Sequence, residues 1–168
     1  MSRARVRPWS ELRQEMVDSP ARAFGTIYRR YQEAANQAYA ARGWKGVTLS
    51  HLQFLSEIQE TGTRLSDIAS ALNTTKQYTG RLAKEMAAKR LVILVTDPLD
   101  QRAVLAKPTE RGWAFLVDAC EVRAELESRY LGHLSKRRAV EFVATLRELV
   151  AASEADDGRC VRSAVRGA

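Results

Sequence analysis

The sequence predicts one mainly α-helical domain with a single small β-hairpin. Apolar residues recur at three- and four-residue spacing over most of the chain, which is the spacing of a buried helix face. β-prone residues gather in the runs LVILV (91–95) and AVLA (103–106), on either side of a short polar tip. A chain of 168 residues with 45% hydrophobic content is long enough to bury one substantial core.

The first long helix is expected over about residues 19–43. Ser19 is a favourable N-cap and Pro20 suits the first turn, whereas Gly43 is typical of a helix end. The apolar residues between them fall on one stripe: Phe24, Ile27, Tyr28, Tyr31, Ala35 and Ala38. Such a stripe predicts that one side of this helix packs against another apolar surface.

Three shorter helices are expected next. Ser50-x-x-Gln53 is a capping-box pattern that predicts the start of the second helix. Ser66 is the expected cap of the third helix, and Thr75 caps a fourth that is expected to reach about Arg90. The apolar or inward-facing residues expected in these helices are Leu49, Leu52, Leu55, Ile58, Ile68, Ala69, Leu72, Thr79, Leu82 and Met86.

Two more helices are expected after the hairpin. Pro108 or Thr109 is expected to begin a long helix, and Ser135 to cap the last one. Their expected inward residues are Trp113, Leu116, Cys120 and Tyr130, then Val143, Leu146 and Val150. From residue 153 the chain is polar, small and unpatterned, so residues 153–168 are expected to form a disordered tail.

Charge is distributed unevenly along the chain. There are 27 Lys and Arg against 20 Asp and Glu, a net charge of +7. Residues 108–168 contain ten basic and ten acidic residues, so the whole excess lies in residues 1–107. A positive field attracts polyanions, nucleic acid foremost, although a basic surface alone is more often an ordinary solvated surface. Arg3, Arg5 and Arg7 lie in a basic N-terminal arm, expected over residues 1–18.

The order of the elements indicates how the chain would meet nucleic acid. A short helix, a tight turn and an amphipathic helix are the parts of a helix-turn-helix, whose second helix enters the major groove. A two-stranded finger directly after it has the position of a wing. Asp97 and Pro98 favour a tight turn at the tip of this finger. Arg102 beside the tip can reach the narrow minor groove, whose negative potential attracts arginine.

These residues resemble the winged helix-turn-helix of the MarR family, the multiple-antibiotic-resistance regulators. The family pattern has an arginine within the recognition helix, a wing D-P-x-D-x-R, and Thr-x-x-Gly at the start of the next helix. The matching residues here are Arg81, Asp97, Pro98, Asp100, Arg102, Thr109 and Gly112. One departure is Arg90, which stands where the family commonly has the glycine that ends the recognition helix.

The resemblance covers about residues 20–152 and implies a mainly α fold with a small β wing. It implies one MarR-like domain over residues 19–152, with the winged helix-turn-helix at about 48–107. Dimerisation helices are then expected at about 19–43 and 108–152. The implied function is a homodimeric transcription regulator, commonly a repressor, that binds a pseudo-palindromic site in double-stranded DNA. A small phenolic or aromatic acid ligand would release it from that site, and no cofactor or metal is implied.

Residue types suggest how DNA would be recognised. Thr75, Lys76, Gln77 and Arg81 lie at the start of the fourth helix, away from the face that Leu82 and Met86 bury. Gln77 could pair with adenine and Arg81 with guanine or a phosphate, while Thr75 and Lys76 suit phosphates. The resemblance suggests a second role for Arg81, which is to pair with Asp100 and hold the wing in place. The alternative for each residue is an ordinary solvated helix surface.

The resemblance also implies a ligand pocket between the dimerisation helices and the DNA-binding part. Its candidate lining residues are Tyr28, Tyr31, Trp44, His51 and Trp113. For any one of them, an ordinary place in the core is the alternative.

Other functional classes find less support. His51 and His133 stand 82 positions apart, and no nucleophile motif is present, so an enzyme is not expected. Gly43-Trp44-Lys45-Gly46 fits the G-x-x-G of RNA-binding KH domains, but a helix end is the favoured interpretation. Two other functions stay open. One is an architectural DNA-binding protein without a ligand. The other is a redox sensor using Cys120 or Cys160, although an inert buried thiol is favoured for Cys120.

The sequence also bears on location. No apolar run approaches the roughly 18–20 residues of a membrane span, and the first residues lack the apolar segment of a signal peptide. A cytoplasmic protein without membrane partners is therefore expected.

Overall fold

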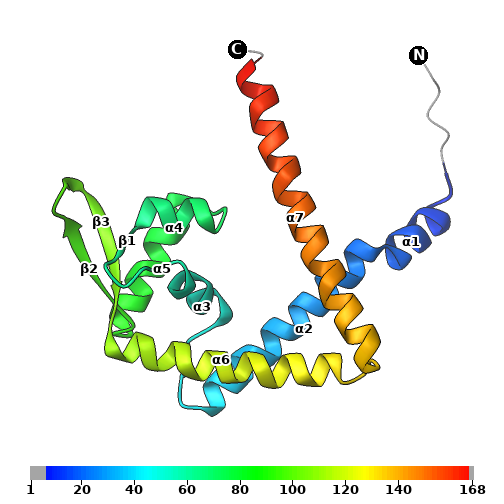
Figure 1. The fold of residues 1–168 in the computed structure, drawn as a ribbon, viewed down its shortest axis with the longest axis horizontal. Helices are drawn as coiled ribbons and strands as arrows, with labels where there is room; N and C mark the ends of the chain where they lie inside the picture. The colour runs from blue at the N-terminus through cyan, green and yellow to red at the C-terminus, as the bar shows by residue number, and fades with distance from the viewer. Residues whose placement is uncertain (1–6, 167–168) are drawn as a thin grey trace. The chain divides into compact units, whose positions relative to one another are not determined.

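The computed structural model describes residues 7–166, with side chains described for residues 7–153. Within this range the chain forms seven α-helices and a three-stranded antiparallel sheet (Figure 1). The prediction of a mainly helical fold with a small β wing is confirmed. The chain divides into two compact units, Met1–Leu126 and Glu127–Ala168.

The first unit contains most of the elements. In chain order they are α1 (Trp9–Asp18), α2 (Pro20–Ala41), α3 (Leu49–Ser56), β1 (Thr63–Arg64), α4 (Leu65–Ala71), α5 (Lys76–Ala88), β2 (Val92–Asp97), β3 (Asp100–Pro108) and the greater part of α6 (Glu110–Leu131). The second unit contains the end of α6 and all of α7 (Lys136–Arg166). No helix in the described part of the chain is long and apolar enough to cross a membrane.

Helix α2 begins and ends as its sequence predicts. The Ser19 hydroxyl accepts a hydrogen bond from the Ala21 amide at 3.2 Å, and Pro20 occupies the first position. At the other end Gly43 has φ = +90°, and the Trp44 amide donates to the Tyr39 carbonyl at 2.9 Å. This left-handed turn is a common helix end, so the interpretation of Gly43 as a helix stop is confirmed.

Helix α3 has a different cap from the one expected. Its N-cap is Thr48, two residues before Ser50. The Thr48 amide donates to His51 Nδ1 at 3.0 Å, and the Thr48 hydroxyl lies 2.7 Å from the same nitrogen. A histidine can therefore fill the place that Glu or Gln takes in the usual capping box. The earlier start also buries Leu49, which fixes how α3 packs.

The helix-turn-helix consists of α4 and α5. Helix α4 starts at Leu65, so Ser66 lies inside the helix and does not cap it. Asn73 closes the turn with φ = +49°, a conformation that asparagine tolerates better than most residues. Thr75 then caps α5, because its hydroxyl accepts a hydrogen bond from the Tyr78 amide at 3.1 Å. The expected inward residues of α5, Thr79, Leu82 and Met86, are all buried.

The sheet has the strand order β1-β3-β2, with both pairs antiparallel. Strands β2 and β3 form the predicted hairpin, whose register becomes irregular between Thr96 and Asp97 at the tip. Strand β1 was not expected from the sequence. Its two residues, Thr63 and Arg64, pair with Ala106 and Leu105 and so tie the start of α4 to the hairpin.

Helix α6 buries a different face from the one expected. The sequence interpretation placed Trp113 and Cys120 inside, but both are exposed. The buried residues are instead Gly112, Phe115, Ala119, Val122 and Leu126. The ring of Phe115 packs edge-on against Tyr39 and Trp44, with centroids 5.1 and 5.3 Å apart.

The start of α6 explains the Thr-x-x-Gly pattern. The Thr109 hydroxyl accepts from the Gly112 amide at 3.0 Å and donates to the Arg90 carbonyl at 2.6 Å. A Cβ atom on Gly112 would lie only 2.1 Å from the Leu91 carbonyl oxygen. Glycine is therefore required where α6 crosses the chain that leaves α5.

Both ends of the chain are more helical than expected. Residues 9–18 of the expected basic arm form α1, and the guanidinium of Arg7, which precedes the helix, pairs with the Glu15 carboxylate. Arg3 and Arg5 lie outside the described residues. Helix α7 continues to Arg166, so the expected disordered tail is wrong from residue 153 to 166. Extending an existing helix needs no new nucleation, and this segment contains three arginines and no proline.

Candidate nucleic-acid interface

Helix α5 presents one buried and one exposed face. Thr79, Leu82, Ala83 and Met86 are buried against the first unit. Lys76, Gln77, Arg81 and Lys84 are exposed on the other side. The expected contact residues of this helix therefore lie on its solvent face, together with a second lysine, Lys84, which the sequence interpretation did not single out.

An open hollow of about 330 Å³ lies at the start of α5. Its lining consists of Thr75, Gln77, Tyr78 and Arg81, of which only Tyr78 was not expected. The Arg81 guanidinium carbon lies 5.5 Å from the centre of the Tyr78 ring, and its Nε atom lies 3.9 Å from Glu85 Oε1. These contacts hold the Arg81 guanidinium along the exposed face of α5, where it can reach a partner.

The electrostatics at this end of α5 favour an anion. The first turn contains no acidic residue that would offset the partial positive charge of the helix N-terminus. Lys76, in the same turn, adds a full positive charge. A phosphate group placed here would meet both the helix dipole and a lysine.

The wing is anchored by Asp97. This carboxylate is only 4% exposed. Its Oδ1 atom accepts from the Leu99 amide at 2.8 Å, and its Oδ2 atom accepts from Arg64 Nε at 2.6 Å and lies 2.6 Å from Arg64 Nη2. The Leu99 amide and the Arg64 guanidinium hold the pKa of the Asp97 carboxyl below its usual range. The tip of the wing is thus fixed both to its own turn and to β1.

Arg102 and Asp100 lie on the outer part of the wing. Both are exposed, and Asp100 Oδ1 accepts a hydrogen bond from the Arg102 amide at 3.0 Å. The structure does not pair Arg81 with Asp100, since Arg81 faces Glu85 and Tyr78. Arg64 and Asp97 form a pair instead, which holds the wing to β1. The sequence offered no signal for this pair, because the two residues are 33 positions apart.

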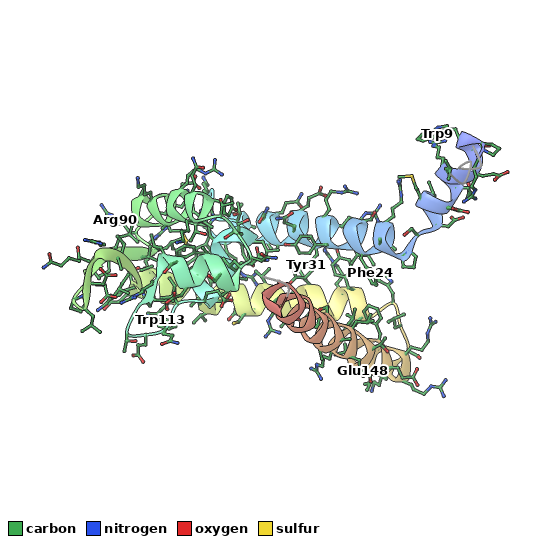
Figure 2. The ribbon with its side chains drawn as sticks, turned by 90° about the horizontal axis from the view of Figure 1, so that it is seen from above. Trp9, Phe24, Tyr31, Arg90, Trp113 and Glu148 are labelled. Atoms are coloured by element: carbon green, nitrogen blue, oxygen red, sulfur yellow. The ribbon has the colours of Figure 1, made fainter. Side chains whose placement is uncertain are left out.

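The five candidate ligand residues lie in different surroundings. Trp44 is buried, with its indole N–H donating to Asp118 Oδ2 at 2.5 Å and the Arg111 guanidinium carbon 4.8 Å from its ring centre. Trp113 is exposed on α6 (Figure 2). Tyr31 is half-buried on α2, and the Tyr28 hydroxyl accepts from Gln53 Nε2 on α3 at 3.3 Å. Trp44 is therefore a core residue, whereas Tyr28 and Trp113 are exposed.

His51 is the most unusual of these candidates. It is buried, and its Nδ1 atom is used in the cap of α3. Among the side chains that the structure describes, its Nε2 is the buried polar atom left without a hydrogen-bond partner. Burial, and next the charge of Lys89, lower the pKa of His51.

In the described part of the chain, no three His, Cys, Asp or Glu residues gather where they could hold a metal ion. The Cys120 thiol is exposed, which corrects the expectation of a buried thiol, and the Cys160 side chain lies outside the described residues.

Comparison with known proteins places this geometry in context. Residues 45–103 match the sequence model of the MarR family. No curated protein matches the chain in sequence.

Solved structures with the same fold include several regulators. A MarR transcriptional regulator from Methanosarcina mazei Go1 has a TM-score of 0.70 at 18% identity, covering 79% of this chain and 94% of its own. MepR from S. aureus, in a complex with DNA, has a TM-score of 0.68 at 20% identity, covering 80% and 98%. A MarR variant from E. coli, complexed with operator DNA, has a TM-score of 0.68 at 15% identity, covering 80% and 96%.

The resemblance inferred from the sequence is thereby confirmed in motif and in fold. Residues 45–103 are similar in sequence to the MarR family model, and the chain shares the fold of solved MarR-family structures.

Proposed function

We propose that this protein is a homodimeric transcription regulator that binds a pseudo-palindromic site in double-stranded DNA. The observation that carries the proposal is the exposed surface at the start of α5. Its hollow is lined by Thr75, Gln77, Tyr78 and Arg81, and the anchored wing exposes Arg102. The DNA complexes of two proteins with this fold support the same assignment.

The exposed side chains suit distinct parts of a duplex. Gln77 can donate to and accept from the edge of adenine in the major groove, and Arg81 suits guanine or a phosphate. Thr75 and Lys76 at the helix start suit phosphates, which fix the position of the helix without reading sequence. Arg102 on the wing would enter the adjacent minor groove, with Asp100 holding its backbone.

Exposed apolar side chains support a dimer. On α2, Phe24, Ile27 and Tyr28 are each about half exposed, and Figure 2 shows Phe24 and Tyr31 projecting from the same side of the helix. Helix α7 exposes Phe142, Leu149 and Val150. Exposed apolar side chains that gather along a helix usually mark an interface. In a two-fold dimer the two copies of α5 would meet half-sites about 10 base pairs apart.

We further propose that the protein acts as a repressor and that a small aromatic acid or phenol releases it from DNA. Tyr28 and Gln53 join α2 to α3, and α3 also contains His51 with its unpartnered Nε2. A hydroxyl or carboxylate oxygen could accept a hydrogen bond from this nitrogen. Phenols and benzoic acids should then raise the melting temperature and weaken DNA binding. An architectural protein would show neither effect.

Selection from a random duplex library tests the main proposal. The full-length protein should enrich a pseudo-palindromic sequence, and its Kd for that duplex can be measured by fluorescence anisotropy. Gln77→Ala should weaken binding roughly 5- to 100-fold, as expected for one lost base contact. Gln37→Ala, at an exposed glutamine of α2, is the matched control and should bind as the parent does.

Three results would contradict the proposal in different ways. Equal affinity for all duplexes would indicate an architectural protein. Preference for single-stranded RNA would support the KH interpretation. Loss of binding on mild oxidation, restored by a thiol, would favour the redox alternative.

A further inference from the structure

Leu99 stands alone at the tip of the wing. It is 90% exposed, which makes it the most exposed large apolar side chain among those that the structure describes; Trp9 follows at 72%. Single exposed leucines are common and carry no meaning by themselves. Leu99 differs from them in its position, because it lies at the end of the wing and three residues before Arg102.

The backbone beneath Leu99 is held firmly. Its amide donates to Asp97 Oδ1 at 2.8 Å, and Asp97 is in turn held by a hydrogen bond and an ion pair from Arg64. On its other side Asp100 begins β3. The tip is therefore fixed by contacts that lie away from the leucine side chain. Little backbone freedom remains to be lost when the tip meets a partner.

A leucine at this point is unsuited to a phosphate backbone. It has no charge and no hydrogen-bond donor, so it would gain nothing from phosphate oxygens. An apolar side chain can instead contact the base edges at the floor of the minor groove, where leucine is one of the residues that insert. Arg102 beside it would supply the attraction to the groove.

The two kinds of base pair differ at that floor. A·T pairs present only the acceptors of adenine N3 and thymine O2, whereas a G·C pair adds the guanine N2 amino group, which projects into the groove. Methyl groups pressed against this amino group would strip its water without offering an acceptor. A leucine on the floor of the groove therefore disfavours guanine.

We propose that Leu99 is a specificity-determining residue that packs on the minor-groove floor and excludes G·C pairs beneath the wing tip. This inference rests on the DNA binding proposed above. Leu99 would distinguish the base pairs themselves, in addition to the contact made by Arg102. Arginine responds mainly to groove width and potential.

Inosine separates the effect of the guanine N2 amino group from the other effects of replacing an A·T pair with G·C. An I·C pair has no minor-groove amino group, but its major-groove edge is that of G·C. The experiment uses the full-length protein and the selected duplex, with each A·T pair outside the two recognition half-sites replaced in turn by G·C and by I·C. Binding is measured by anisotropy at one salt concentration for the parent protein, Leu99→Ala and the control Gln101→Ala, which changes an exposed neighbour on the wing.

The expected result is a position where G·C weakens binding of the parent about tenfold and I·C restores it. Leu99→Ala should bind G·C and A·T duplexes within about twofold of each other, and Gln101→Ala should discriminate as the parent does. Discrimination that survives in Leu99→Ala, or that inosine does not relieve at any position, would overturn the inference while DNA binding still stands. If the parent protein selects no duplex at all, the proposed function fails first, and this inference fails with it.

Circular dichroism and sedimentation of the variants serve as controls. Because Leu99 is exposed and its backbone is held by Asp97, Leu99→Ala should fold and assemble as the parent does.

Discussion

Arg90 holds an unusual backbone conformation just after the end of α5. Its φ is +59°, in the left-handed region that glycine adopts most easily. The MarR-like pattern has glycine at this place, so the structure gives the physical reason for that pattern. The strain persists here because the Thr109 hydroxyl donates to the Arg90 carbonyl and the Arg90 amide donates to the Ala87 carbonyl.

Replacing Arg90 should therefore stabilise the protein. Arg90→Gly removes the clash of Cβ with the backbone and should raise the free energy of unfolding by about 1 kcal/mol. Ala87→Gly, three residues earlier and inside α5, should lower it by about 1 kcal/mol. Urea unfolding measures both. A loss of stability in Arg90→Gly would mean that the arginine side chain stabilises more than its backbone costs.

Removal of the Asp100 carboxylate has two opposite expected effects on DNA affinity. Removing a negative charge near DNA should improve binding by Coulomb attraction, but the carboxylate also holds the Arg102 amide at 3.0 Å. We expect Asp100→Ala to weaken binding to the selected duplex, because the wing loses this hydrogen bond. Asp100→Asn keeps an acceptor without the charge and should bind at least as tightly as the parent.

Arg102→Ala should weaken binding by about 1–3 kcal/mol without changing the fold, because this side chain is exposed. Titration of these variants at fixed salt gives the comparison. An Asp100→Ala protein that binds more tightly than the parent would show that its carboxylate has no bracing role.

At the scale of elements, the start of α6 controls the packing of the first unit. The close approach of Gly112 to the Leu91 carbonyl sets the rotation of the helix and therefore which residues face inward. Gly112→Ala should destabilise the protein by about 3 kcal/mol, since backbone must move. Gly80→Ala, on a helix with open space around the glycine, should instead stabilise by about 1 kcal/mol. Equal effects of the two changes in thermal unfolding would contradict this account.

The cap of α3 should make stability depend on pH. His51 Nδ1 accepts the Thr48 amide, so the cap requires a neutral ring. Burial lowers the pKa of His51 below its ordinary value of 6.5. The contribution of the neutral ring is therefore complete above about pH 6.5 and is lost as the pH falls through the lowered pKa.

Urea unfolding at pH 8 and pH 5 measures this effect. The parent should be less stable at pH 5, and His51→Gln should lose most of the difference. His133→Gln, at an exposed histidine, is the control and should retain it. A His51→Gln variant with the pH dependence of the parent would rule out this role.

Local signals in the sequence predicted the elements well. The caps at Ser19 and Thr75, the stop at Gly43 and the wing turn at Asp97 all depend on residues close in the chain. The inward face of α6 was wrong because this helix is apolar on two sides, and only its distant partners Tyr39, Trp44 and Leu91 decide between them. Strand β1 and the Arg64–Asp97 pair were missed for the same reason, since each depends on residues more than 30 positions away.

At the scale of the whole molecule, charge and apolar surface point to different partners. The net charge of +7 favours a polyanion, and Lys76, Arg81 and Arg102 lie exposed on α5 and the wing. The apolar side chains of α2 and α7 favour a second copy of the chain. Residues 1–18 and 153–168 were expected to be a basic arm and a disordered tail, but residues 9–18 and 153–166 are helical.

The salt dependence of DNA affinity tests the central claim most directly. If each protomer of a dimer places Lys76, Arg81 and Arg102 on phosphates or in the grooves, about six counterion sites are displaced, and log affinity should fall with log salt at a slope of roughly −5. Arg102→Ala removes two of these contacts from the dimer and should reduce the magnitude of the slope by about two. A slope near zero for the parent protein would mean that DNA is not its partner.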